Sequence, residues 1–303
     1  MTYEQLLIQT ALEDERFVVM TAENRALVRN APAALGSRFI DTGITEQTMI
    51  GMAAGLALRG RIPVVHALAP FLTMRAYEFI RTDLGIARLP VKLSGYIPGF
   101  LSDGNGPTHQ SIEDVSIMRG IPGMEVYCPA DEDDLVGMLP AIWSSPAPAY
   151  VRINHKKGNY SHTPYVPGKA EVVARGTDVT LLVYGFLFGN ALQAKAILER
   201  EGFSVGLINM RSLKPVDDEA IVGAALESGR LVTIEDHLQT GGLYSVVAEV
   251  LLRWRMTADV LSLSLGERWF KPGLLDQVLE TEGFTPEKMA AKIKNANSFT
   301  YAQ

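Results

Sequence analysis

The sequence predicts an α/β fold built from two doubly wound, mostly parallel-sheet domains. Short apolar, β-branched runs of strand length alternate with longer segments of helical period along the chain. A polar stretch rich in turn residues, residues 154–168, interrupts this alternation once. The 303 residues are enough for two hydrophobic cores. We therefore place a domain boundary near residue 160, which gives domains 1–160 and 161–303.

The first half alternates strands and helices up to the polar stretch. Its predicted strands are short apolar runs at residues 17–20, 38–40, 62–66, 91–94, 124–127 and 150–153. The segments of helical period between them are residues 45–59, 71–82 and 131–141. A loop rich in glycine and proline, residues 96–110, follows the fourth strand.

The second half repeats the same alternation. Strands are predicted at residues 180–184, 204–208, 230–234 and 260–263, and helices at residues 190–201, 217–228 and 242–254. Thr285 precedes a proline, which is typical of a cap residue followed by the first position of a helix. A last helix is therefore expected from Pro286.

Composition and charge restrict the class of protein. Hydrophobic residues make up 47% and charged residues 20%, which is ordinary for a soluble enzyme. A net charge of −6 argues against a nucleic acid or an anionic membrane as the main partner. The single cysteine, Cys128, excludes an internal disulfide. The first residues lack a signal-peptide pattern, and no apolar run approaches the roughly 20 residues of a membrane span, so we expect a cytoplasmic protein.

The motif Asp41-Thr42-Gly43-Ile44-Thr45-Glu46-Gln47 lies between a predicted strand and a predicted helix. A carboxylate in the first turn of a helix usually does no more than complement the helix dipole, and spacing alone favours that interpretation for Glu46. Together with the following Gly-x-Ala-x-Gly-Leu-Ala at residues 51–57, however, the motif resembles the pyrimidine-binding domain of transketolases and deoxyxylulose-phosphate synthases.

The resemblance implies a catalytic role for Glu46. In that family the glutamate hydrogen-bonds ring nitrogen N1′ of the aminopyrimidine of thiamine diphosphate. The shared proton favours the imino tautomer, which then takes the proton from the thiazolium carbon, and the cofactor carries the covalent chemistry. Glu46 is thus implied to bind the cofactor and to activate it.

The segment from Phe71 to Glu78 has two interpretations. Periodicity favours an amphipathic helix with Phe71, Met74 and Tyr77 on its core side. The resemblance instead implies an aromatic wall at the beginning of this helix, on which the aminopyrimidine stacks. Phe71 matches that wall best, and Met74 and Tyr77 are candidates to share it.

The loop Asp103-Gly104-Asn105-Gly106-Pro107-Thr108-His109-Gln110 follows a strand, where open α/β sheets bind ligands. Its Gly-Pro-Thr-His-Gln is similar to the transketolase pattern, which implies that His109 binds the donor near the scissile bond and handles protons. Sugar-phosphate transketolases carry aspartate four residues earlier, where this chain has the uncharged Asn105. Asn105 is still expected to contact substrate, but the donor and acceptor sugars stay open.

Arg152 lies in the last predicted strand of the first half. An arginine in such a place commonly pairs with a carboxylate. The resemblance implies that it binds the terminal phosphate of the substrate, and a sulfonate would match the same guanidinium fork.

The second half is similar to the C-terminal domain of transketolases at residues 207–217 and 231–237. Glu235 and His237 lie two apart on a strand but lack a third ligand, so we expect no metal site in this chain. The chain also lacks the Gly-Asp-Gly motif with which the family binds metal and diphosphate. The resemblance therefore implies a partner that supplies the N-terminal half of a transketolase and holds Mg²⁺ (or Ca²⁺), in an α₂β₂ assembly.

Four functions fit these observations. The first is the second subunit of a two-component transketolase, which transfers a two-carbon ketol unit between anionic sugars. The others are the β subunit of a 2-oxoacid dehydrogenase decarboxylating component, a deoxyxylulose-phosphate synthase and a non-catalytic assembly subunit of the same fold. The dehydrogenase β subunit usually has Asp-Thr-Pro-Ile-x-Glu and lacks Gly-Pro-Thr-His-Gln. Deoxyxylulose-phosphate synthase is normally a longer chain. The joint presence of Glu46, Phe71 and His109 favours an enzyme.

Overall fold

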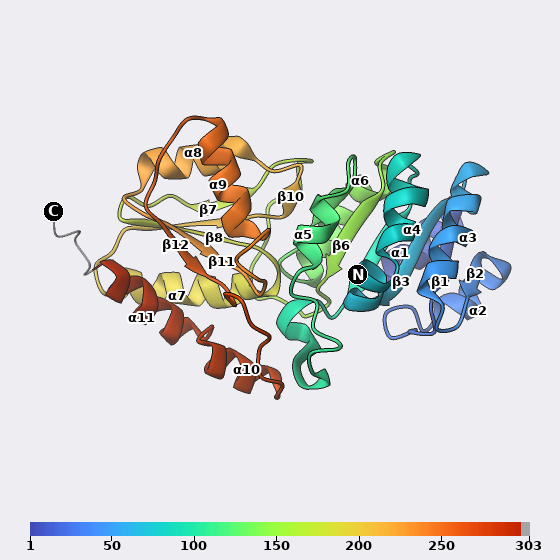
Figure 1. Ribbon diagram of the computed structural model, residues 1–303, viewed down its shortest axis with the longest axis horizontal. Coiled ribbons are helices and arrows are strands. Elements are labelled where there is room, and N and C mark those ends of the chain that lie inside the picture. Colours follow the sequence, from blue (N-terminus) through green and yellow to red (C-terminus); the bar gives the residue numbers. More distant parts are fainter. Residues whose placement is uncertain (298–303) are drawn as a thin grey trace.

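The computed structural model describes residues 1–297 and contains two α/β lobes side by side, the N-terminal half from blue to green and the C-terminal half from yellow to red (Figure 1). The first sheet has seven strands in the order β10-β5-β6-β4-β3-β1-β2, all paired in parallel except β10. Its strands are β1 (Phe17–Thr21), β2 (Phe39–Asp41), β3 (Ile62–Leu68), β4 (Lys92–Tyr96), β5 (Glu125–Tyr127), β6 (Ala149–Ile153) and β10 (Ser212–Lys214).

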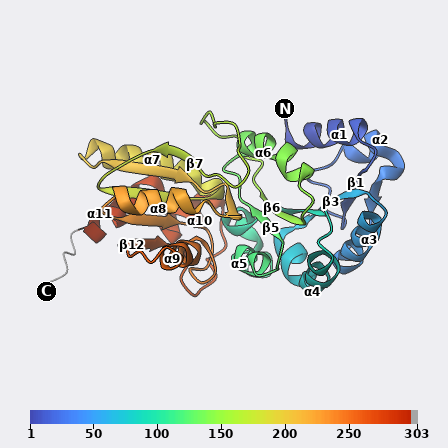
Figure 2. The ribbon, with the colours of Figure 1, turned by 90° about the horizontal axis from the view of Figure 1, so that it is seen from above.

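Helices cover both faces of this sheet, with α1, α2 and α6 on one face and α3, α4 and α5 on the other (Figure 2). Their bounds are α1 (Tyr3–Glu13), α2 (Ala31–Leu35), α3 (Glu46–Leu58), α4 (Tyr77–Phe79), α5 (Asp114–Arg119) and α6 (Glu132–Ser144), with short 3₁₀ turns η1 (Gly36–Arg38) and η4 (Gly99–Asn105). Thr2 starts α1 with a capping box, and Asp131 caps α6 through the Asp134 N–H.

The second sheet has five strands in the order β12-β11-β8-β9-β7, and only β7 is antiparallel. Helices α8 and α9 lie on one face, and α7 and α11 lie on the other (Figure 1). The elements are β7 (Glu171–Ala174), β8 (Val179–Val183), η5 (Gly185–Leu187), α7 (Phe188–Arg200), β9 (Val205–Asn209), α8 (Asp218–Glu227), β11 (Leu231–Ile234), α9 (Leu243–Arg253), β12 (Val260–Leu263), α10 (Leu275–Glu282) and α11 (Pro286–Asn297). The predicted fold class is confirmed.

The two halves are joined more closely than the polar stretch between them suggests. Strand β10 leaves the second half and pairs with β5 of the first sheet, Ser212 opposite Tyr127. One apolar cluster also runs through both halves, from Met20 and Met49 in the first to Leu231 and Val246 in the second. The halves therefore share a sheet edge and part of their core.

The segment predicted as one helix at residues 71–82 is not a regular α-helix, and the prediction was wrong there. It consists of two π-helical pieces, η2 (Phe71–Arg75) and η3 (Ile80–Ile86), on either side of the short α4. π-Helical turns are uncommon and often occur at functional sites. Among the described residues, none of the helices combines the length and the apolarity needed to cross a bilayer.

Candidate active site

Glu46 begins α3 directly after the turn that leaves β2. Asp41, the last residue of β2, accepts hydrogen bonds from the Gly43 and Glu23 N–H groups, each at 3.0 Å, and so fixes the backbone of this turn. Burial opposes its charge, but these bonds and Arg25 lower the pKa of Asp41. The turn places the Glu46 side chain inside, where it is 2% exposed.

Arg75, which the sequence analysis did not select, contacts Glu46. Its guanidinium donates to both carboxylate oxygens of Glu46, at 3.1 and 3.2 Å, although the Arg75 side chain is 40% exposed. The same guanidinium lies 4.1 Å from the centre of the Phe71 ring, a cation–π contact. The sequence did hold a signal for Arg75, because it lies four positions after Phe71 and residues at that spacing share one face of a helical segment.

The Phe71 ring also contacts His109 on the glycine-rich loop. The two rings are 5.0 Å apart at an angle of 67°, an edge-to-face contact. Nδ1 of His109 lies 2.9 Å from the Thr108 hydroxyl, so that hydroxyl helps to orient the imidazole. A chain of contacts thus links three separate segments. Glu46 contacts Arg75, Arg75 contacts Phe71, and Phe71 contacts His109.

Sheet topology explains why these three segments meet. Strands β2, β1, β3, β4 and β6 are neighbours and run in parallel, so their carboxyl ends lie on one edge. Glu46 follows β2, Phe71 follows β3 and the His109 segment follows β4. This edge is where open α/β sheets bind ligands.

Three other expected site residues lie in different surroundings. Met74 is 38% exposed, whereas Tyr77 is half-buried and packs against the apolar core. Asn105 is exposed, and its side-chain amide donates to the Ser102 carbonyl at 2.8 Å within η4. The roles expected for Met74, Tyr77 and Asn105 stay predictions.

Arg152 is not placed with these groups, and its expected role as an anion anchor needs correction. The side chain is 3% exposed, and its Nε donates to Asp114 at 2.8 Å. One terminal nitrogen donates to Asp236 at 2.6 Å and the other to the Ser111 carbonyl at 3.3 Å. Every nitrogen of the guanidinium therefore has a protein acceptor, and Arg152 joins the two halves of the chain.

A second buried ionic network resembles a metal site but contains cations of its own. Ligand atoms of Asp134, His162 and Glu171 lie within 4.8 Å of one another. Arg211 pairs with Asp134 at 2.8 Å and with Glu171 at 3.0 Å. Burial opposes a charge on His162, but hydrogen bonds to Asp131 and Glu171 raise the pKa of His162 to about 9. The imidazolium and the guanidinium thus balance these carboxylates.

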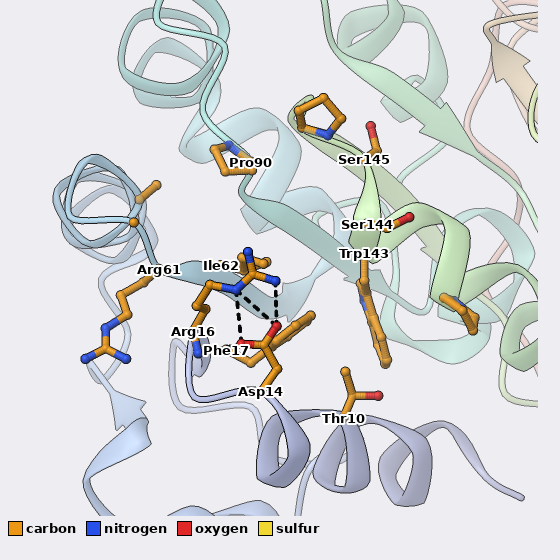
Figure 3. Close-up of a pocket in the computed structure, with 14 residues that line it drawn as sticks. Thr10, Asp14, Arg16, Phe17, Arg61, Ile62, Pro90, Trp143, Ser144 and Ser145 are labelled. Atoms are coloured by element: carbon orange, nitrogen blue, oxygen red, sulfur yellow. Dashed lines mark hydrogen bonds and ion pairs between the residues drawn. The ribbon is translucent and has the colours of Figure 1, made fainter.

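A cavity of about 530 Å³ opens at the opposite, amino-terminal edge of the first sheet (Figure 3). It is lined by residues at the starts of β1 and β3, by Trp143 from the end of α6, and by the ion pair between Arg16 and Asp14. Glu46, Phe71 and His109 do not line it. The candidate site is instead an open edge with exposed Arg75 and Met74.

Two doubly wound domains, with a buried carboxylate at a helix start and an aromatic ring and an imidazole at the same sheet edge, agree with the resemblance to proteins that bind the aminopyrimidine of thiamine diphosphate. The family profile described as "Transketolase, pyrimidine binding domain" matches residues 1–161, and "Transketolase, C-terminal domain" matches residues 168–289. The chain belongs to the transketolase family.

Relatives include both split and single-chain enzymes. The 6-deoxy-6-sulfo-D-fructose transketolase subunit SqwH of Clostridium sp. (strain MSTE9) is 34% identical over 95% of this chain and 91% of that protein. The 1-deoxy-D-xylulose-5-phosphate synthase of Heliobacterium modesticaldum is 33% identical, but this chain spans only 46% of its length. The solved structure described as "Split gene transketolase, inactive beta4 tetramer" is 31% identical, with a TM-score of 0.85 over 97% of this chain and 96% of that one.

Proposed function

We propose that this chain is the pyrimidine-binding subunit of a two-component, thiamine diphosphate-dependent transketolase that moves a two-carbon ketol unit between anionic sugars. The observation that carries the proposal is the set of contacts that links Glu46, Phe71 and His109 at the carboxyl edge of the sheet. The likeness to a sulfo-sugar transketolase subunit over nearly the full length of both proteins supports a split enzyme.

The residues present fit the aminopyrimidine half of the cofactor. When bound, thiamine diphosphate supplies the carbon nucleophile that carries the two-carbon unit. Glu46, buried at a helix start, offers a carboxyl group to hold a proton against a ring nitrogen. Phe71 is partly exposed, but the Arg75 guanidinium lies over its ring. Arg75 therefore has to leave both Phe71 and Glu46 for the pyrimidine to stack on the ring and contact the carboxyl group.

His109 is proposed to hold the donor sugar and to exchange protons with its hydroxyl and carbonyl oxygens. Exposed His155, Lys156 and Lys157 follow β6, and the His155 ring lies 5.2 Å from that of Tyr96 at the end of β4. Because β6 lies two strands from β3, the positive charge of Lys156 and Lys157 is roughly 10 Å along the edge from the segment that carries Phe71. This charge is available to bind the phosphate or sulfonate end of a sugar. Arg152 is too deeply buried to do so.

The partner is proposed to be a chain equivalent to the N-terminal half of a transketolase, in an α₂β₂ assembly. It would supply the metal, Mg²⁺ or Ca²⁺, and the groups that bind the diphosphate. Exposed apolar side chains beside the site support such an interface, among them Ile44 at 68%, Met52 at 41% and Phe79 at 39% exposure.

Reconstitution tests the proposal. The chain would be purified alone and together with a co-expressed subunit of the N-terminal-half type, with fructose 6-phosphate and 6-deoxy-6-sulfofructose as donors and erythrose 4-phosphate as acceptor. Only the complex with thiamine diphosphate is expected to form product. Equal turnover by the chain alone would overturn the two-component reading. A complex that uses only pyruvate would favour a deoxyxylulose-phosphate synthase instead.

A further inference from the structure

The loop that carries His109 belongs to the first half but is held by the second. We define the His109 loop as residues 97–111, whose base is closed by a hydrogen bond of 2.8 Å from the Gly99 N–H to the Ser111 carbonyl. Near its start the Phe100 ring packs between Phe270 and Phe284, at 5.1 and 5.0 Å. These rings belong to the core of the second half, so the loop is docked there.

One buried ion pair contacts both ends of this loop. One carboxylate oxygen of Asp236 accepts the Phe100 N–H at 3.1 Å, and the other accepts from Arg152 at 2.6 Å. Arg152 in turn donates to the Ser111 carbonyl at 3.3 Å. Asp236 and Arg152 are 2% and 3% exposed. Gly99 has a φ of +56°, and a Cβ there would overlap Asp236, so the chain is tightly fitted at this point.

On the basis of the proposed function, we infer that Asp236, from the second half, is a positioning residue for His109. Asp236 contacts Phe100 and Arg152 but not His109. It fixes the loop base, and the base sets the distance between the imidazole and Phe71. A misplacement of about 1 Å at a reacting group can lower turnover about 100-fold, so the loop base bears directly on the rate.

The ion pair between Asp236 and Arg152 does more than hold the two halves together, because it also contacts the His109 loop. The network of Glu171, His162 and Arg211 also joins them, because His162 pairs with Asp131 and Arg211 with Asp134 of the first half. It contacts the segment around residue 163 and not the His109 loop. If cohesion were the only role of the Asp236 pair, losing either network would have the same effect on turnover. Glu171 therefore provides a matched control: a buried carboxylate in the second half with an arginine partner.

The test compares Asp236→Asn with Glu171→Gln in the reconstituted complex. Both changes remove a buried negative charge but keep the shape of the side chain. Asp236→Asn is expected to lower kcat roughly 10- to 100-fold while the KM for thiamine diphosphate stays within about twofold of the unmodified complex. Glu171→Gln is expected to keep kcat within about twofold below its unfolding temperature. An equal loss of kcat in both variants, or an unchanged kcat in Asp236→Asn, would overturn the inference.

Hydrogen exchange on the chain itself gives a second readout that needs no activity. In Asp236→Asn the amides of Gly99 and Phe100 are expected to exchange at least ~10-fold faster, whereas Glu171→Gln leaves them unchanged. Unchanged protection in Asp236→Asn would refute the positioning role even if the complex proved not to be a transketolase. If Asp236→Asn does not fold, Arg152→Lys is judged by the same criteria, because lysine keeps the charge but not the fork that reaches both Asp236 and Ser111.

Discussion

Arginine–carboxylate pairs occur both at the candidate active site and between the two halves of the chain, and they differ in exposure. Arg75 is 40% exposed and shares its guanidinium between Glu46 and the face of Phe71. Arg152 is 3% exposed and has a protein acceptor for each of its nitrogens. A ligand can therefore reach and displace the Arg75 guanidinium, whereas the Arg152 guanidinium is enclosed by protein.

This difference separates a pair that a ligand can displace from a pair that also stabilises the fold. A pair whose arginine stays in contact with water is easier to separate than a fully buried pair, because water solvates the guanidinium when the contact is lost. A buried pair that loses one partner leaves an uncompensated charge, which costs about 3–5 kcal/mol. Substitution of Glu46 should thus affect turnover with little change in stability, whereas substitution in the buried pair should lower stability in addition to the turnover effect inferred for Asp236.

The largest expected effect is on turnover at the exposed edge. Glu46→Gln removes the carboxyl proton partner but keeps the shape of the side chain, so kcat of the reconstituted complex should fall by about 10²- to 10⁴-fold. Steady-state kinetics measures the loss, and chemical denaturation should show a stability close to that of the unmodified chain. The exposed Glu78, on α4, provides the control as Glu78→Gln, which should keep normal turnover. Near-normal kcat in Glu46→Gln would reduce Glu46 to a helix-start residue.

The next effect is on stability between the halves. Arg152→Met leaves Asp114 and Asp236 buried without their cation, so the free energy of unfolding should fall by about 3–5 kcal/mol. Urea denaturation followed by fluorescence measures the shift of the midpoint. A change below about 1 kcal/mol would show that burying the two carboxylates without their cation costs little, and the contrast with the exposed pair would be lost.

The sequence was sufficient for the parts of the site that follow from local pattern and topology. Glu46, Phe71 and His109 each come after a strand, and parallel neighbours bring their carboxyl ends together. The sequence was insufficient where contacts between distant residues determine the surroundings of a side chain. Asp114 and Asp236, the partners of Arg152, lie 38 and 84 residues away from it, and no spacing rule connects them.

Of the secondary structure that was not predicted, two strands and one irregular helix were missed for similar reasons. Strands β7 and β10 lie at sheet edges, pair in antiparallel fashion, and are only four and three residues long. Ser212-Leu213-Lys214 has no β-branched run, so only its pairing with β5 makes it a strand. The π-helical turn of η2, which carries both Phe71 and Arg75, likewise leaves no signal in helical periodicity.

A smaller, pH-dependent effect is expected from His162. The pKa of His162 is about 9 in the folded chain, above the ordinary value of 6.5, so folding takes up a proton between these values. Its contribution to stability, on the order of 3 kcal/mol, is complete below pH 6.5 and is lost as the pH rises through 9. Urea midpoints measured from pH 6 to 10 should therefore fall more steeply for the unmodified chain than for His162→Gln. Parallel profiles would contradict the charged state of His162.

The smallest effect is expected at Arg75, and it decides how the exposed pair is interpreted. Arg75→Met should lower the free energy of unfolding less than Arg152→Met does, because the Arg75 guanidinium is exposed and water screens its contact with Glu46. If Arg75 only occupies the place of the pyrimidine, its loss should leave the affinity for thiamine diphosphate unchanged or raise it. Titration of the complex with the cofactor measures this. A loss of kcat as large as that of Glu46→Gln would instead mean that Arg75 holds Glu46 in its working orientation, and the exposed pair would then belong to the catalytic machinery as a unit.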